Sequence, residues 1–452
     1  MDETKRLFSN RQLFQLLWPL IIEQLLNVLV GMIDVVMVAS LGEAAVSGVS
    51  LVDSINQLVI QFLAALTAGG TVVCSRFIGM KNNKKASESA GQLVFITVTG
   101  ALAVAILFIL SGKNLLSVIF GQVENSVMDN AYIYFIITSL SFPFLALYNS
   151  GAALFRSVGN SKISMRVSIL MNGLNIIGNA ICIFGLHMRV SGVAIPTLIS
   201  RMVAAILIFY LLEKRNNEIR INGIESLKPD KKILSQILSI GIPAGIESGM
   251  FHFGKLILQS LVSTLGTASI AGYAVACNLV MFLYLPGNAL GLGLTTVVGQ
   301  CIGAGEPKQA KQYTNRFIML DYAFLLALTM VLGIFNRTWI GLYNLSDQAS
   351  LLASGLIISH CIAMLVWPIA FLLPHSLRAA NDAKFTMIIA IVSMWVFRVL
   401  LAYFYIKVMR QNVLYIWYAM YADWLFRAIV FFIRYRKYTH RISNQLARSR
   451  LE

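Results

Sequence analysis

The sequence predicts an all-α integral membrane protein with twelve transmembrane helices in two pseudo-symmetric six-helix lobes. Three observations support this: an excess of apolar residues, twelve apolar runs of membrane length, and an internal repeat. Of 452 residues, 58% are hydrophobic and 12% are charged, and the mean hydropathy is +0.74. A soluble chain carries roughly twice that charged fraction. Much of the apolar surface must therefore face lipid, which is an expected partner.

Twelve apolar runs are long enough to cross a bilayer, because a spanning helix needs about 20 residues. The polar residues 1–11 lack a small-residue cleavage site after a short apolar core, so we expect no removable signal peptide. The predicted spans are 12–38, 48–75, 88–111, 129–149, 163–184, 191–212, 234–262, 270–298, 313–335, 350–373, 385–406 and 412–433.

The basic residues indicate the orientation. Most of the 36 Lys and Arg residues lie in the N-terminus, the even-numbered loops and the C-terminal tail. The odd-numbered loops hold Lys113, Arg189, Arg337, Lys407 and Arg410. Cytoplasmic loops carry the excess of Lys and Arg, so both termini are expected in the cytoplasm of a multi-pass protein of the cell membrane. The net charge of +16 is thus a topology signal, and no nucleic-acid partner is predicted.

The motifs that would indicate an enzyme or a metal site are missing from the sequence. The five cysteines are scattered singly, without a C-x-x-C pair or a His/Cys cluster. The sequence contains no Walker loop and suggests no pairing of a nucleophile with a base. We therefore expect no enzyme activity, no disulfide framework, no cofactor and no zinc site.

An internal repeat relates the two halves of the chain, first with an offset of 224 residues and later with an offset of 222. Because each half holds six spans, both halves enter the membrane in the same orientation, as in transporters built from parallel repeats. The matched residues are Pro19 with Pro243, Glu23 with Glu247, Gly42 with Gly266, Gly69 with Gly293, Lys84 with Lys308, Arg156 with Arg378, Lys162 with Lys384 and Ala180 with Ala402.

The repeat predicts the domain organisation. Residues 1–212 are expected to form an N-lobe of spans 1–6, residues 213–232 a cytoplasmic linker, and residues 233–452 a C-lobe of spans 7–12 with a basic tail. Two similar lobes around a central cleft suit a monomeric transporter that works by alternating access.

Several motifs resemble those of the multidrug and toxic compound extrusion (MATE) family. They occur in the family's order along nearly the whole chain. They are Trp18-Pro19, Ile33 to Gly42, Leu174 to Asn179, Gly192-Val193-Ala194, Gly299 to Gly305, and the twin segments Arg156–Lys162 and Arg378–Lys384.

The resemblance implies a secondary active exporter of organic, often cationic, compounds coupled to inward proton or sodium flow. In prokaryotic members the ion site lies in the N-lobe, and the matching positions here are Asp34, Asn175, Asn179 and Thr197. Asn179 stands where relatives carry a second carboxylate. This departure weakens a sodium site and leaves the choice between H⁺ and Na⁺ open.

Glu23 and Glu247 are candidates for a substrate-binding or second proton site. An ionisable residue at mid-membrane costs about 2.5–3.5 kcal/mol on insertion scales, so each should face the cleft or its lobe interior. Glu247 lies one turn earlier than the acid that other multidrug members carry after the corresponding proline, so its role is argued from position alone. Lys255 shares its helix face and could neutralise it.

Other charged residues within the spans are interpreted structurally. Asp423 and Arg427, four residues apart, are expected to pair. Arg201 and Arg398 are expected to be buried structural cations. Asp53 and Asp321 lie within reach of helix ends and are interpreted as solvated.

Two alternative functions are considered. A flippase for lipid-linked or polysaccharide precursors would add two helices and line its cleft with basic residues. A receptor without transport would need a ligand or signalling domain, and the loops here reach only about twenty residues. The acidic residues deep in the spans favour the exporter.

Overall fold

The computed structural model describes residues 6–121, 123–213, 219 and 228–448, with side chains to residue 437. The described residues form two compact units, one within 8–245 and the other within 246–448 together with residues 6 and 7, and the boundary between them falls inside helix α8. Most of the predicted linker, residues 214–218 and 220–227, lies outside the described residues, and the predicted linker residues Lys231 and Lys232 already belong to α8.

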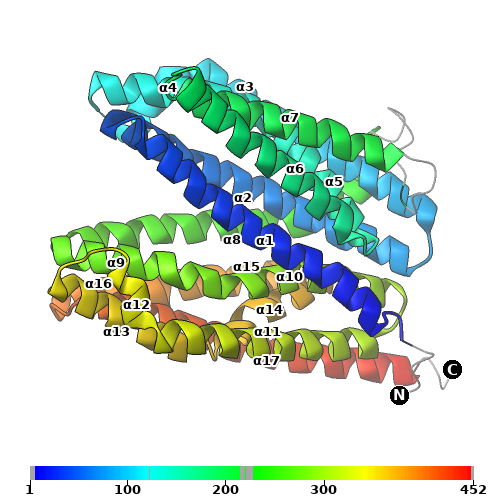
Figure 1. Ribbon diagram of the computed structural model, residues 1–452. Coiled ribbons are helices and arrows are strands. Elements are labelled where there is room, and N and C mark those ends of the chain that lie inside the picture. The colour runs from blue at the N-terminus through cyan, green and yellow to red at the C-terminus, as the bar shows by residue number, and fades with distance from the viewer. Residues whose placement is uncertain (1–5, 122, 214–218, 220–227, 449–452) are drawn as a thin grey trace. The chain divides into compact units, whose positions relative to one another are not determined.

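The first unit is a bundle of long helices (Figure 1). Helix α1 packs along α6, and α2 packs against α3, α4 and α5. Its helices are α1 (Asn10–Ala39), α2 (Glu43–Gly79), α3 (Asn83–Phe120), α4 (Asn125–Leu140), α5 (Phe142–Ser157), α6 (Ser161–Ala180), the π-helical turn η2 (Ile181–Gly185) and α7 (Ser191–Glu213).

The second half of the chain repeats this order with more irregular helices. They are α8 (Lys231–Ser263), α9 (Thr267–Val280), η4 (Met281–Leu283), α10 (Tyr284–Gly303), α11 (Pro307–Ile334), α12 (Asn336–Gly341), α13 (Asp347–Ala363), α14 (Trp367–Ala379), α15 (Ala383–Val392), η5 (Ser393–Leu400), α16 (Leu401–Tyr403), η6 (Phe404–Val408) and α17 (Leu414–Arg448). The predicted basic tail continues α17 as far as Arg448.

The fourth span of each repeat is bent. Helices α4 and α5 meet at 44°, and α13 and α14 meet at 53°. Pro143 and Pro368 lie in the first turn after each break. Proline lacks an N–H and its ring clashes with the carbonyl four residues earlier, so a continuous helix cannot pass through it undistorted.

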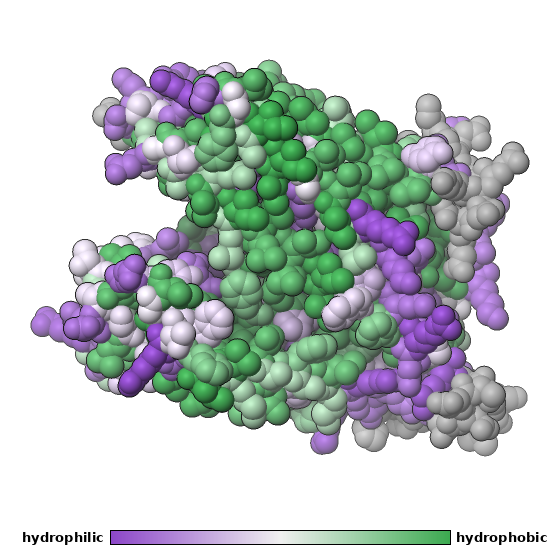
Figure 2. Space-filling view, in the orientation of Figure 1, coloured by the Kyte–Doolittle hydropathy of each residue, from purple (hydrophilic) through white to green (hydrophobic). Residues whose placement is uncertain are grey.

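Ten helices of the described chain are long and apolar enough to cross a membrane, or up to twelve when each bent pair counts as one span. This confirms the predicted all-α fold. Apolar side chains cover the middle of the helices on the face that Figure 2 shows, and hydrophilic ones gather at their ends.

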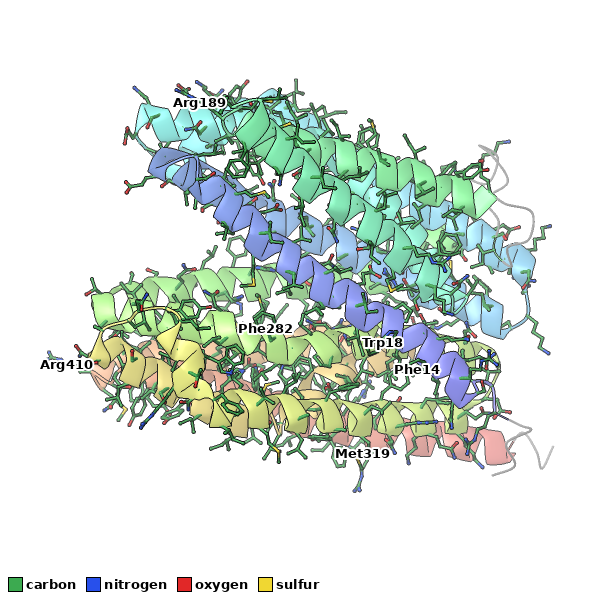
Figure 3. The ribbon with its side chains drawn as sticks, in the orientation of Figure 1. Phe14, Trp18, Arg189, Phe282, Met319 and Arg410 are labelled. Atoms are coloured by element: carbon green, nitrogen blue, oxygen red, sulfur yellow. The ribbon has the colours of Figure 1, made fainter. Side chains whose placement is uncertain are left out.

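Aromatic and basic side chains mark the ends of the first unit. Phe14 and Trp18 project from α1, with exposed fractions of 63% and 51%, and their rings stack with centroids 6.0 Å apart. Figure 3 shows them near the start of α1 and Arg189 at the far end of the same unit. Exposed aromatic residues near the end of a span are typical of the membrane interface.

Candidate functional site

A cavity of about 540 Å³ lies within the first unit. Side chains from α1, α2, α4, α5, α6 and α7 line it, and most of its polar residues come from inside the spans. Its charged lining residues are the acidic Glu23, Asp34 and Asp53 and the basic Arg201. The cavity is therefore a polar volume whose charged lining residues are mostly acidic.

The four residues predicted for the coupling site are joined in one hydrogen-bonded chain. Asn179 Nδ2 donates to Asp34 Oδ1 at 2.8 Å and lies 3.4 Å from Asn175 Oδ1. Asn175 Nδ2 donates to Thr197 Oγ1 at 3.0 Å, and the Thr197 hydroxyl donates to the Val193 carbonyl at 2.9 Å. The chain thus links α1, α6 and α7.

Helix geometry explains this convergence. Asn175 and Asn179 are one turn apart, so their side chains lie on one face of α6. Gly178 lets α7 approach that face, because a Cβ at Gly178 would lie 2.8 Å from Pro196 Cβ. The close approach places Thr197, the residue after Pro196, beside Asn175.

A second polar cluster in the cavity includes residues whose role the sequence did not reveal. Asp53 Oδ1 accepts a hydrogen bond from the Tyr134 hydroxyl at 3.2 Å and lies 3.5 Å from Asn56 Nδ2. Asn56 also donates to Thr138 Oγ1 at 3.3 Å. The prediction of a simply solvated Asp53 overlooked these partners. The sequence signal that could have revealed these partners was the position of Asp53, ten residues after the start of α2.

Arg201 is the basic residue of the cavity wall. Its Nη1 donates to Ser141 Oγ at 2.6 Å. Ser141 lies at the α4–α5 break, so a span-embedded cation is anchored where the helix backbone is interrupted.

Glu23 and Glu247 each lie beside an arginine. Glu23 Oε1 is 3.4 Å from Arg156 Nη1, and its Oε2 accepts from Ser164 Oγ at 3.1 Å. Glu247 Oε1 is 2.9 Å from Arg378 Nη2, so Arg378 is its partner where the sequence suggested Lys255. Glu23 also lines the cavity. The assignment of these two acids to a substrate or second proton site stays a prediction.

Two interpretations of charged residues can be checked directly. The pairing of Asp423 with Arg427 is confirmed, with Oδ1 and Nε 2.7 Å apart, and Arg398 approaches the other carboxylate oxygen at 3.7 Å. The interpretation of Asp321 as a solvated residue is wrong, because its exposed fraction is 0%. Asp321 lies at the middle of α11, with its carboxyl group beside Gly287 of α10.

The hydrogen-bonded chain of Asp34, Asn179, Asn175 and Thr197, called the coupling chain below, has oxygen atoms that could hold a cation. Asp34 supplies a carboxylate, Thr197 a hydroxyl, and the two asparagines amide oxygens, which are the ligands that hard cations prefer. Within the described part of the chain, the buried Asn179 Oδ1 has no hydrogen-bond partner. The chain therefore offers one carboxylate and one uncommitted amide oxygen to a bound ion.

Comparison with known proteins places these features in a family. The MatE family model matches residues 19–181 and 243–404, one segment in each repeat. The chain is 28% identical over 429 residues to the uncharacterized transporter YisQ of Bacillus subtilis, covering 94% of this chain and 93% of that one. It is 26% identical to the probable multidrug resistance protein NorM of Thermotoga maritima, covering 94% and 92%.

Solved structures share the fold. An outward-facing multidrug resistance MATE family transporter of the MOP superfamily superposes with a TM-score of 0.90 over 96% of both chains, at 20% identity. A MATE protein in the bent conformation superposes with a TM-score of 0.89 over 97% of both chains. Since the family model covers both repeats and more than half of the chain, the protein belongs to the MATE family of membrane transporters, which act without enzymatic chemistry or a cofactor.

Proposed function

We propose that the protein is a monomeric secondary active exporter of small organic cations, driven by inward proton flow through Asp34. The hydrogen-bonded chain from Asp34 to Thr197, at the wall of an acidic cavity, is the observation that supports this most directly. The two lobes, joined by the linker between α7 and α8, alternate access to the two sides of the cell membrane. Both termini lie in the cytoplasm.

The charge of the cavity supports a cationic substrate. Three carboxylates and one guanidinium line it among the described residues. Arg156 offsets the charge of Glu23, which leaves Asp34 and Asp53 against Arg201. A large delocalised cation loses less hydration free energy than a small ion when it enters such a site. Tyr134 and Tyr148 also line the cavity, and an aromatic ring attracts a cation that lies over its face.

The chemistry of the coupling chain favours a proton over sodium. Asp34 accepts a hydrogen bond from an amide nitrogen, and Asn179 stands where a second carboxylate would strengthen the attraction for a metal cation. A single carboxyl group needs no further ligand to bind and release a proton. Uptake of a proton cancels the Asp34 charge, and its release restores the attraction of the cavity for the organic cation.

The test is transport in proteoliposomes with a proton or a sodium gradient imposed separately. Ethidium serves as the fluorescent lipophilic cation and calcein as the anionic control. We expect ethidium movement against its gradient with the proton gradient and none for calcein. Export driven by sodium alone would overturn the choice of ion, and calcein export without ethidium export would overturn the substrate class.

The variant Asp34→Asn tests the role of the carboxylate with little change in volume. It should lose uphill ethidium export while keeping normal expression. Asp129→Asn is the matched control, because Asp129 forms an exposed ion pair with Lys113 at 2.7 Å outside the cavity. Wild-type uphill export by Asp34→Asn would place coupling elsewhere.

A further inference from the structure

Asp321 on α11 is a fully buried carboxyl group in the second unit. Its exposed fraction is 0%, and neither of its oxygens has a hydrogen-bond partner among the described residues. A Cβ at Gly287 would lie 3.2 Å from Asp321 Oδ2 and 2.0 Å from the Trp367 ring, so the carboxyl group lies where α10 and α14 approach closely. The absence of a side chain at Gly287 leaves room for both groups.

The internal repeat shows that the fold does not require a carboxyl group here. With the 224-residue offset, Asp321 corresponds to Thr97, and the burial pattern keeps this register: Leu93 and Phe317 are both fully buried. Thr97 Oγ1 lies 2.7 Å from Ser150 Oγ and donates to the Leu93 carbonyl at 2.7 Å. In the first unit this position thus holds a neutral hydroxyl group whose hydrogen bonds are satisfied.

The partner hydroxyl is lost in the second unit. With the 222-residue offset, Ser150 corresponds to Leu372, which is 1% exposed. The second repeat therefore holds an acid at the first of these positions and lacks a hydroxyl at the second. An unpaired ionised carboxylate in an apolar interior is so costly that the group takes up a proton instead.

The carboxyl group also lies beside an interrupted span. The hydroxyl of the next residue, Tyr322, donates to the Leu365 carbonyl at 2.8 Å, within the break between α13 and α14. Trp367 begins α14 at the same break. Interrupted helices at membrane depth form ion and substrate sites in secondary transporters, because their free backbone groups line such sites.

The titratable groups on the helices around α11 have other partners. Tyr284 on α10 is bonded to His360 on α13 at 2.8 Å, and on α14 His375 lies 3.2 Å from Thr295 while Arg378 pairs with Glu247. The charged groups of α17 form ion pairs: Asp423 with Arg427, and Arg434 with Asp382. Its tyrosines are also bonded, because Tyr421 lies 3.0 Å from Ser359 and Tyr435 donates to the Lys311 carbonyl. Cys301 on α10 and Cys361 on α13 are free thiols. None of these contacts reaches Asp321.

We propose that Asp321 is a second proton-binding site, located in the C-terminal repeat at the α13–α14 break and separate from Asp34. In the conformation described here the carboxyl group carries a proton. Movement of α14 at the break opens the group to water, where it releases the proton. The proposal extends the proposed function and does not depend on the role of Asp34.

The experiment is infrared spectroscopy of the purified full-length protein in nanodiscs, which detects the C=O stretch of protonated carboxyl groups without any transport. The main variant is Asp321→Thr with Leu372→Ser, which copies the Thr97–Ser150 pair of the first repeat and should therefore fold. Asp321→Asn is the second variant, and Asp129→Asn, at the exposed ion pair with Lys113, is the control.

We expect a protonated-carboxyl band at neutral pH that alkaline titration removes reversibly. This band should be lost in both Asp321 variants and retained in Asp129→Asn. An unchanged band in the Asp321 variants, or a band that no pH removes, would overturn the proposal. If ethidium export fails but this band behaves as expected, the proposed substrate is wrong and the proton site stands.

Discussion

Glu23 and Arg156 form an ion pair that Glu247 and Arg378 repeat in the second half of the chain. The closest atoms are 3.4 Å apart in the first pair and 2.9 Å in the second. Each pair joins the first span of its repeat to the end of the bent fourth span. The pairs explain how a carboxylate is accommodated inside each span, because a buried charge is tolerated when a counter-ion and hydrogen bonds accompany it.

The first prediction concerns the stability of this pair. Arg156→Gln should lower the free energy of unfolding by about 3 kcal/mol, because it leaves the Glu23 carboxylate buried and unpaired. The double variant Glu23→Gln/Arg156→Gln should recover much of the loss. Denaturant unfolding followed by tryptophan fluorescence measures both. Lys113→Gln, at an exposed ion pair, is the control, and an equal loss there would show that burial is not the cause.

The second prediction concerns the charge of the cavity. Asp53→Asn should weaken ethidium binding about tenfold, which corresponds to about 1.4 kcal/mol, because it removes one of the three carboxylates of the wall. Tyr134→Phe removes the hydrogen bond to Asp53 and keeps the charge, so it should weaken binding less. Fluorescence titration of the purified protein measures both affinities. Equal effects would mean that the hydrogen bond, and not the charge, matters.

The third prediction concerns the choice of ion. Asn179→Asp places a second carboxylate next to Asp34 and should introduce export driven by a sodium gradient, since two carboxylates attract a metal cation more strongly than one. Asn172→Asp is the matched control, because Asn172 lines the same cavity but bonds to Asn27 and Ser168. Sodium-driven ethidium export in both variants, or in neither, would show that position 179 does not select the ion.

The fourth prediction concerns topology. In a cysteine-free background, Ser40→Cys and Thr264→Cys should react with an impermeant maleimide added outside intact cells. Lys81→Cys should react only after permeabilisation. All three positions are exposed at helix ends. The reverse pattern would invert the orientation that the basic residues predict.

Much of the fold could be predicted from the sequence because the bilayer imposes simple rules. Span length, the distribution of Lys and Arg and the repeat are local or periodic features, and they predicted twelve spans in two similar halves. The motif resemblance also selected Asp34, Asn175, Asn179 and Thr197, which the structure joins in one hydrogen-bonded chain. Their role in coupling stays a prediction.

Tertiary structure alone decided the partners of the charged residues. Lys255 shares a helix face with Glu247, yet the partner of Glu247 is Arg378, 131 residues away in the chain. Asp321 and Asp53 look alike in sequence, but one is sealed in an apolar interior and the other accepts a hydrogen bond from Tyr134 in a cavity. Helix periodicity determines which residues share a face, whereas helix packing determines which groups that face contacts. The free energy of a charge inside the membrane depends on those contacting groups.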